Sequence, residues 1–280
     1  WRIDDVMVSY AAQGGSVGPH YDNYDVFLIQ GLGTRLWHVG GLCSGASATL
    51  DNEQLRLLAD FTAVQTWLLQ PGDMLYLPPL YGHWGIADSS DCMTYSIGFR
   101  APSYSEILSD YCDDRIAHLQ QELRYTDIGL PAQSNPGEIG PDAIATIRDI
   151  LQQQLTDSRH ITDWFGRFMT RPKYHIDATD SEDSANSAKL LSLMQEYGII
   201  FRDPASRFAF FRDGQDSVLF VNGESYSCHA AKSTLAQLLA AQDAYQTEQL
   251  TEFLNDLECA KLLLQLLNQG SLYFDDEGYH

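Results

Sequence analysis

The sequence is poor in positive charge. Its 280 residues include 17 Lys and Arg against 38 Asp and Glu, which gives a formal net charge of −21 at pH 7. Proteins that bind DNA or RNA neutralise phosphates with Lys and Arg, so this composition argues against direct binding of nucleic acid. A surplus of carboxylates instead favours a basic partner and accelerates the encounter with one.

Long apolar runs and paired cysteines are also lacking. No run approaches the ~20 apolar residues that cross a bilayer, and no signal-peptide pattern opens the sequence as given, so we expect no membrane attachment. The five cysteines are scattered and form no C-x-x-C pair. They predict a reduced, cytoplasmic protein without a disulfide framework or a zinc site built on cysteines.

Two histidines and an aspartate carry the strongest chemical signal. His20 and Asp22 open a strand-like run, and residues two apart in an extended strand point to the same side, so both can bind one ion. His83 follows far downstream, after a turn and an apolar run. Two imidazoles and one carboxylate on one face are the ligand set of a non-haem Fe(II) oxygenase, which keeps positions open for a chelating cosubstrate and dioxygen. The alternative for His83 is a core histidine satisfied by backbone groups.

A second H-x-D sequence has different surroundings. His175 and Asp177 lie beside the polar stretch 178–183, which has no strand pattern and no strand-borne histidine after it. We therefore expect a linker at this position. The first copy instead follows the loop Gly14–Pro19, whose glycines allow the backbone to approach a ligand closely.

Arg35 stands at the start of the strand after the first H-x-D. A 2-oxoglutarate cosubstrate chelates iron through its keto acid end and directs its other carboxylate into the protein. A guanidinium can meet that buried carboxylate with two parallel hydrogen bonds. We therefore predict Arg35 as its partner, and the alternative is a surface arginine at a hairpin.

The first hundred residues have the pattern of short strands. Gly and Pro turns between many such strands favour a barrel or jelly roll, of which the double-stranded β-helix of the cupin type is one example. A short helix, Asn52–Phe61, is predicted between the strands. The predicted strands are Trp1–Tyr10, Tyr21–Gln30, Arg35–Val39, Thr66–Leu69, Met74–Leu77, His83–Ala87 and Cys92–Phe99.

The pattern changes to helical periodicity after about residue 102. Apolar stripes and a helix-starting proline predict helices over Tyr104–Tyr125, Pro141–Leu155 and Ile161–Met169. The run from Thr179 to Ser184 is polar and acidic, and it forms a plausible domain boundary.

Residues 181–280 have the order helix, hairpin, helix. The hairpin turns are expected at Asp213-Gly214 and Asn222-Gly223. This order resembles a winged-helix domain, but 6 Lys or Arg against 15 Asp or Glu argue for protein contact rather than DNA binding. The predicted elements are the helix Ala188–Tyr197, the strands Phe208–Phe211 and Ser217–Phe220, and the helices Thr234–Ala241 and Thr247–Asn268.

Three separated segments together resemble the JmjC branch of the 2-oxoglutarate oxygenases. They are Gly14–Gly31, Pro71–Pro79 and Thr94–Ser103. More narrowly, they are similar to the bacterial ribosomal oxygenases, which hydroxylate an arginine of a large-subunit ribosomal protein. The resemblance implies an α+β multidomain fold, with a JmjC double-stranded β-helix over residues 1–102. A helical dimerisation region over 103–180 and an acidic winged-helix-like domain over 181–280 would follow it.

The same resemblance implies roles for individual residues. It makes His20, Asp22 and His83 the iron ligands, Arg35 the partner of the distal carboxylate of 2-oxoglutarate, and Ser9 a second contact to that cosubstrate. The implied cofactors are Fe(II), 2-oxoglutarate and dioxygen. The implied activity is hydroxylation of the arginine β-carbon in a basic ribosomal protein, carried out by a cytoplasmic homodimer.

The chain also departs from the usual pattern of this family. Leu36 and His38 stand where relatives tend to be richer in arginine. The sequence begins directly at a strand, whereas relatives have further strands upstream, so we expect a fragment of the complete barrel. Asp25 and Tyr21 are candidates to hold the cationic guanidinium of a substrate.

Three alternative functions stay open. The same chemistry could act on another side chain, as in a histidyl or asparaginyl hydroxylase or a lysine demethylase. A non-catalytic cupin-like module could bind basic proteins, although a pure binder has no need of all three ligands. A cupin-type metal enzyme without 2-oxoglutarate, such as an isomerase, would have no need of Arg35.

Overall fold

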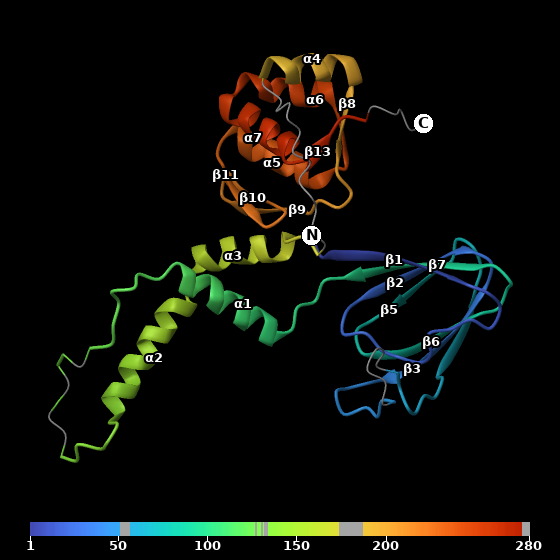
Figure 1. The fold of residues 1–280 in the computed structure, drawn as a ribbon, viewed down its shortest axis with the longest axis horizontal. Coiled ribbons are helices and arrows are strands. Elements are labelled where there is room, and N and C mark those ends of the chain that lie inside the picture. Colours follow the sequence, from blue (N-terminus) through green and yellow to red (C-terminus); the bar gives the residue numbers. More distant parts are fainter. Residues whose placement is uncertain (51–56, 127, 130, 132–133, 174–186, 276–280) are drawn as a thin grey trace. The chain divides into compact units, whose positions relative to one another are not determined.

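The computed structural model describes residues 1–50, 57–126, 128–129, 131, 134–173 and 187–275 (Figure 1). The chain separates into two compact units. Arg2–Ser103 forms the N-terminal unit, and Trp1 together with Tyr104–His280 forms the C-terminal unit. Among the described residues, no helix has both the length and the apolar character needed to cross a membrane.

The N-terminal unit consists of two antiparallel sheets. One sheet has the strand order β1-β7-β2-β5, and the other has the order β4-β3-β6. This double sheet of short strands is the jelly roll that the sequence predicts. The strands are β1 (Ile3–Ala11), β2 (Val26–Leu32), β3 (Arg35–Leu42), β4 (Gln65–Leu69), β5 (Met74–Leu77), β6 (Tyr81–Ala87) and β7 (Cys92–Phe99).

Alternating side chains of both sheets build the core of this unit. Val26 and Leu28 of β2 pack with Trp37 of β3, and Leu69 and Leu77 complete the cluster. Burying side chains of this size contributes about 1.5–3 kcal/mol each. Trp37 needs a glycine as its neighbour across the sheet, because a Cβ on the paired Gly85 would lie 2.7 Å from the indole ring.

Two predictions for the N-terminal unit are wrong in part. The strand predicted over Tyr21–Gln30 begins only at Val26, because the chain before it makes a loop with a single bridge from His20 to His83. Within the predicted helix Asn52–Phe61, residues 52–56 lie outside the described part of the chain. The remaining residues are not helical, and Leu58 instead bridges to Thr49.

The C-terminal unit begins with three helices, α1 (Tyr104–Ala117), α2 (Pro141–Leu155) and α3 (Ser158–Thr170). Helices α1 and α3 pack through Tyr111, Trp164 and their neighbours. Because α1 ends at Ala117, the helix predicted over Tyr104–Tyr125 is too long. Helix α3 starts earlier than predicted because the Asp157 carboxylate accepts a hydrogen bond from the His160 backbone N–H and caps the first turn.

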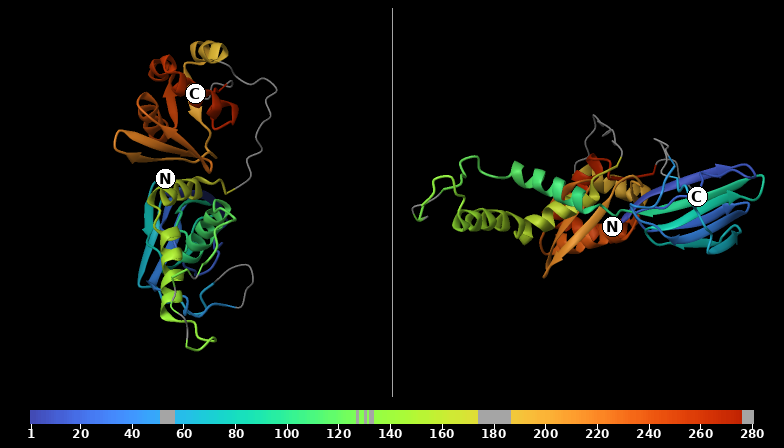
Figure 2. Two further views of the ribbon diagram at one scale, coloured as in Figure 1. Left: turned by 90° about the vertical axis from the view of Figure 1, so that its left-hand side faces the viewer. Right: turned by 90° about the horizontal axis from the view of Figure 1, so that it is seen from below.

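The rest of the unit is a winged-helix domain, as predicted. The sheet β11-β10-β9 turns at the two predicted hairpins and lies beside α3 (Figures 1 and 2). A second small sheet, β12-β8-β13, was not predicted. The elements are α4 (Ser187–Tyr197), β8 (Ile199–Arg202), β9 (Phe208–Asp213), β10 (Asp216–Val221), β11 (Glu224–Cys228), α5 (Ala231–Ala241), β12 (Ala244–Gln246), α6 (Thr247–Thr251), the 3-10 turn η1 (Glu252–Asn255), α7 (Leu257–Asn268) and β13 (Leu272–Tyr273).

Buried leucines from α4, α5 and α7 form the core of the winged-helix domain. The helix predicted over Thr247–Asn268 is broken in the structure, because Asp256 is extended and accepts hydrogen bonds from the backbone N–H groups of Glu258 and Cys259. That cap starts α7 afresh. Where α3 meets β10, Gly166 lies against the Phe220 ring, and a Cβ there would come within 2.3 Å of it.

Candidate metal centre

His20 and His83 lie side by side because their backbones pair. The His20 N–H donates to the His83 carbonyl at 3.0 Å, and the His83 N–H donates to the His20 carbonyl at 2.8 Å. The two imidazole centroids are 4.3 Å apart. His83 belongs to β6, whereas His20 lies in the loop before β2. A reciprocal backbone bridge, rather than a shared strand, therefore fixes the spacing of the two rings.

Backbone carbonyls also orient both rings. Nδ1 of His20 lies 2.9 Å from the Gly18 carbonyl oxygen, and Nδ1 of His83 lies 3.0 Å from the Tyr81 carbonyl oxygen. A carbonyl oxygen only accepts, so each Nδ1 carries the hydrogen and each Nε2 presents a lone pair. This is the arrangement that positions a histidine to bind a metal through Nε2.

Asp22 completes the group from the same loop. Its backbone carbonyl accepts a hydrogen bond of 2.7 Å from the N–H of Leu80, which has a positive φ of 69°. The Asp22 carboxylate lies 3.6 Å from Nε2 of His83. One ligand atom from each of His20, Asp22 and His83 lies within 4.8 Å of the others. The structure thus brings together the three residues that the sequence predicts as ligands, and their donor set fits Fe(II).

Burial keeps His83 neutral. Only 3% of this residue is exposed. Desolvation lowers the pKa of the His83 imidazole, and the neighbouring His20 lowers it further, whereas the Tyr81 carbonyl and Asp22 oppose this change. A neutral imidazole is the form that binds a metal ion.

Arg35 is a buried cation that has no acidic partner in the described part of the chain. It is 6% exposed, its Nε donates to Cys92 Sγ at 3.4 Å, and its Nη1 donates to Ser9 Oγ at 3.4 Å. The guanidinium also lies over the Trp37 ring, 5.7 Å from the centroid. No carboxylate of the described residues lies within ion-pair distance of it. A buried charge is normally paired, so this site is suited to an anionic ligand.

A polar network behind Arg35 was not predicted. Gln30 is 1% exposed, and its Nε2 donates to Cys92 Sγ at 3.4 Å, while Thr94 Oγ1 donates to Gln30 Oε1 at 2.9 Å. The sequence does hold a signal for this network. Gln30 lies on the same face of β2 as Val26 and Leu28, and a polar residue on a core face needs buried partners.

Other predicted residues are engaged elsewhere or are not described. The Asp25 carboxylate accepts hydrogen bonds from Arg2 Nη2 at 3.2 Å and from the Tyr76 hydroxyl at 2.7 Å. The Tyr21 hydroxyl donates to the Ser44 carbonyl at 3.1 Å. Neither group is thus an unengaged partner for a substrate guanidinium. The second H-x-D, at 175–177, lies outside the described residues.

Comparisons with known proteins agree with this geometry. A family model described as a JmjC domain matches residues 1–107, and a ROXA-like winged helix matches residues 152–273. The chain is 31% identical over 278 residues to the ribosomal protein uL16 3-hydroxylase of Escherichia coli K12, which covers 98% of this chain and 72% of that protein.

Solved structures of an E. coli protein have the same fold. The X-ray structure of E. coli ycfD superposes with a TM-score of 0.87 at 30% identity, covering 98% of this chain and 72% of that one. The structure of YcfD, a ribosomal oxygenase, in complex with cobalt and 2-oxoglutarate has a TM-score of 0.82 at 30% identity, covering 98% and 71% of the two chains.

Proposed function

The chain belongs to the JmjC-domain ribosomal oxygenases, and from that premise we propose that it is an Fe(II)- and 2-oxoglutarate-dependent protein hydroxylase. Its substrate is an arginine of a large-subunit ribosomal protein, oxidised at the β-carbon. One observation carries this proposal: two histidines with oriented Nε2 atoms and an aspartate stand together in the same unit as a buried Arg35 that has no acidic partner among the described residues.

His20, Asp22 and His83 would hold the iron. Bound Fe(II) would couple the reduction of dioxygen to the decarboxylation of 2-oxoglutarate, and that decarboxylation yields succinate and carbon dioxide. The protein fixes the tautomer of both imidazoles through the Gly18 and Tyr81 carbonyls. It therefore supplies ligands that need no reorientation when the metal binds.

Arg35 would bind the distal carboxylate of 2-oxoglutarate. Its Nε is already occupied by Cys92 Sγ, so the carboxylate is received at the Nη1 and Nη2 end of the guanidinium. Ser9 Oγ, 3.4 Å from Nη1, lies at the same end, and its hydroxyl would supply a second contact by turning from the Thr94 carbonyl to the carboxylate. Burial of Arg35 keeps water away from the ion pair, which strengthens it.

The substrate is basic and the chain is acidic. A net charge of −21 favours encounter with a ribosomal protein and opposes direct contact with RNA. We place the enzyme in the cytoplasm, where such a substrate is made. The proposed division is a catalytic domain over 1–102, a helical region over 103–180 and a winged-helix domain over 181–280.

Helix α2 is proposed to form a homodimer. It has no buried residue in the structure, although one side of it is apolar and lines a shallow groove. A second copy of the chain would cover this side, as the helical region does in the resembled family. The exposed apolar residues of α2 are Ile144, Ile147, Ile150, Leu151 and Leu155.

The test is 2-oxoglutarate turnover by the purified protein with Fe(II) and basic peptides of ribosomal proteins. We expect peptide-stimulated succinate and a +16 mass shift on an arginine, and no shift on matched peptides with lysine in place of that arginine. Succinate without peptide modification would overturn the arginine assignment. No turnover by the folded, iron-loaded protein would overturn the oxygenase assignment.

A further inference from the structure

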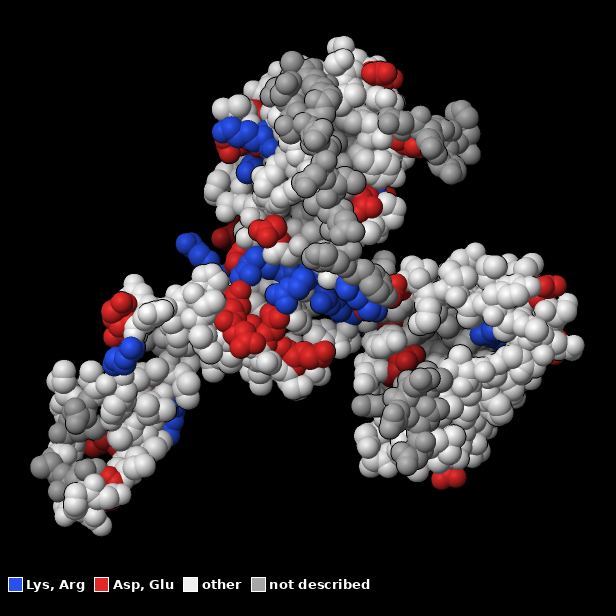
Figure 3. Space-filling view, viewed as in Figure 1, with Lys and Arg blue, Asp and Glu red and all other residues white. Residues whose placement is uncertain are grey.

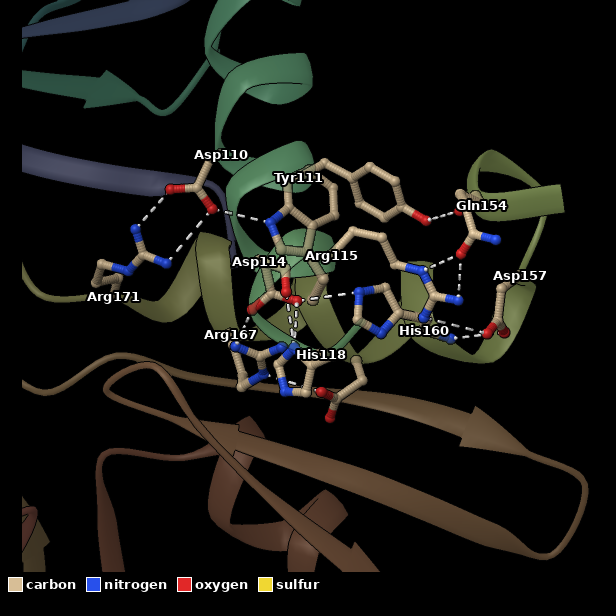
Figure 4. A network of polar contacts seen from close by, with 12 residues as sticks. Asp110, Tyr111, Asp114, Arg115, His118, Gln154, Asp157, His160, Arg167 and Arg171 are labelled. Carbon is tan, nitrogen blue, oxygen red and sulfur yellow. Dashed lines mark hydrogen bonds and ion pairs between the residues drawn. The ribbon is translucent and has the colours of Figure 1, made fainter. Parts of the chain in front are cut away.

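A second group of side chains of metal-ligand type lies where α1 and α3 meet (Figure 4). Asp114 lies in the last turn of α1, and His118 is the residue directly after that helix, with its Nδ1 3.8 Å from Asp114 Oδ2. His160 reaches them from the first turn of α3. One ligand atom from each residue lies within 4.8 Å of the others.

Two atoms of this group are buried without a hydrogen bond. Asp114 Oδ2 and His160 Nε2 are shielded from solvent, and neither has a hydrogen-bond partner among the described residues. They are 3.0 Å apart, which is close enough for an ion pair with a protonated imidazole, but they are not aligned as a hydrogen bond. A cation bound by both atoms would satisfy both, whereas a shared proton would need better alignment.

Three arginines lie near this group, and each contacts a carboxylate. Arg167 donates to Asp114 Oδ1 and to Asp163, each at 2.9 Å, and Arg171 pairs with Asp110. Arg115 binds the Gln154 side chain and lies 3.8 Å from Asp157. Arg167 thus contacts Asp114 through Oδ1, whereas Oδ2 faces the imidazoles of His118 and His160.

Asp114 is firmly placed. Arg167 Nη1 donates to its Oδ1 at 2.9 Å, and this charge-assisted hydrogen bond fixes the carboxylate. The His160 ring packs edge to face against Tyr111, with centroids 5.6 Å apart. Ligating carboxylates and histidines are commonly held by such outer contacts.

His118 supplies the third ligand. Its Nδ1 lies 2.7 Å from the Asp114 carbonyl oxygen and 3.8 Å from Asp114 Oδ2. Its side chain is 57% exposed, so the ring has room to turn toward the metal. Two imidazoles and one carboxylate, with an open side toward water, suit Zn(II) or Co(II).

We propose that Asp114, His118 and His160 form a second divalent-metal site, separate from the iron ligands, that joins α1 to α3. The ion is of the Zn(II) class, and water fills its remaining position. Because ligands from α1, from the residue that follows it and from α3 meet at one ion, binding stabilises the packing of this helix pair.

The test uses the chain with His20→Ala and His83→Ala, which removes two ligands of the first group. After treatment with a chelator, Zn(II) binding is measured by equilibrium dialysis with elemental analysis, and Co(II) binding by visible absorption. We expect one bound ion per chain and a higher melting temperature with Zn(II). Adding His160→Gln should weaken binding by more than the roughly 100-fold that loss of an outer partner costs. The matched control His229→Gln, at an exposed histidine paired with Asp216, should leave binding unchanged.

The proposal is overturned if the double variant is folded by circular dichroism and binds neither Zn(II) nor Co(II). It is also overturned if His160→Gln keeps full affinity, or if the melting temperature responds to acid but not to metal. Should the double variant not fold, the unaltered chain should bind two ions, and His160→Gln should reduce this to one.

Discussion

The two groups of candidate metal ligands in this protein have the same composition and different surroundings. Around His20, Asp22 and His83, backbone carbonyls orient the imidazoles. Around Asp114, His118 and His160, arginines and carboxylates form an ion-pair network. Figure 3 shows the same difference on the surface, with Lys and Arg beside Asp and Glu over α1 and α3, and few charges over the visible face of the N-terminal unit.

This difference indicates which kind of metal ion each group suits. Histidines whose rings are oriented by the backbone suit an iron ion that keeps its other positions for oxygen ligands and a cosubstrate. A carboxylate already shared with Arg167 suits a structural ion that ties two helices together. Residues 1–103 contain four arginines and no lysine. A buried cation such as Arg35 is therefore unusual in the N-terminal unit.

The largest expected effect is that of His83→Ala. It removes an oriented Nε2 ligand, so iron binding and peptide hydroxylation should fall more than about 100-fold, beyond the cost of losing an outer partner. The measurement is succinate formation together with iron content. His38→Gln in the same sheet is the matched control and should keep the succinate formation and the iron content of the wild type. Normal iron content in His83→Ala would contradict its role as a ligand.

Arg35→Ala should have the next largest effect. Loss of charged hydrogen bonds of about 1.5–3 kcal/mol corresponds to roughly a 10- to 100-fold higher 2-oxoglutarate requirement. Iron binding should be largely spared, and Arg35→Lys should fall between wild type and Ala. Calorimetric titration of 2-oxoglutarate into the metal-loaded protein measures this. Lost iron binding with unchanged cosubstrate affinity would show that Arg35 has another role.

Asp114→Asn changes only the second group, and its effect is expected on the stability of the protein. In metal-free protein it should lower the free energy of unfolding by about 2 kcal/mol, because a charged hydrogen bond to Arg167 is lost. The pKa of Asp114 is lowered in the folded state, so its contribution is present above the ordinary value of 3.8 and disappears as the pH falls below it. Urea unfolding at several pH values measures the loss of stability and its pH dependence. Asp113→Asn, on the exposed side of α1, is the control. If the Asp114→Asn variant keeps a lower free energy of unfolding than the wild type in acid, the ion-pair account is contradicted.

The smallest expected effect is that of Cys92→Ala. It removes the sulfur that accepts from Arg35 Nε and Gln30 Nε2, and a hydrogen bond of about 1 kcal/mol corresponds to roughly a fivefold weaker binding of 2-oxoglutarate. Cys92→Ser, which keeps an acceptor, should restore part of the affinity, and iron content should not change in either variant. Equal affinity of the Ala variant and wild type would show that Cys92 does not position Arg35.

The sequence predicted the jelly roll and the winged helix because both depend on local patterns. Strand alternation, glycine turns and the hairpin at Asn222-Gly223 are readable within a few residues. The helix break at Asp256 was missed, since its cap interrupts an apolar pattern that continues on both sides. The early end of α1 at Ala117 was missed because Leu119 and Leu123 extend the apolar stripe beyond the helix.

The grouping of His20, Asp22 and His83 was predicted for a reason that the structure corrects. His20 and Asp22 were expected on one strand, yet both lie in a loop, and the bridge to His83 brings them together. The network of Gln30, Cys92 and Arg35 depends on contacts between residues more than 50 positions apart, which no local pattern reveals. The pairing of Asp114 with His160, which are 46 positions apart, is likewise not revealed by any local pattern.

The most direct test of the central claim is anomalous X-ray scattering at the cobalt edge from crystals of this chain grown with Co(II) and 2-oxoglutarate. We predict a cobalt peak between His20, Asp22 and His83, with the distal carboxylate of 2-oxoglutarate at the Nη1 and Nη2 end of Arg35. A crystal that has no cobalt at these three residues, or that holds the distal carboxylate away from Arg35, would contradict the account.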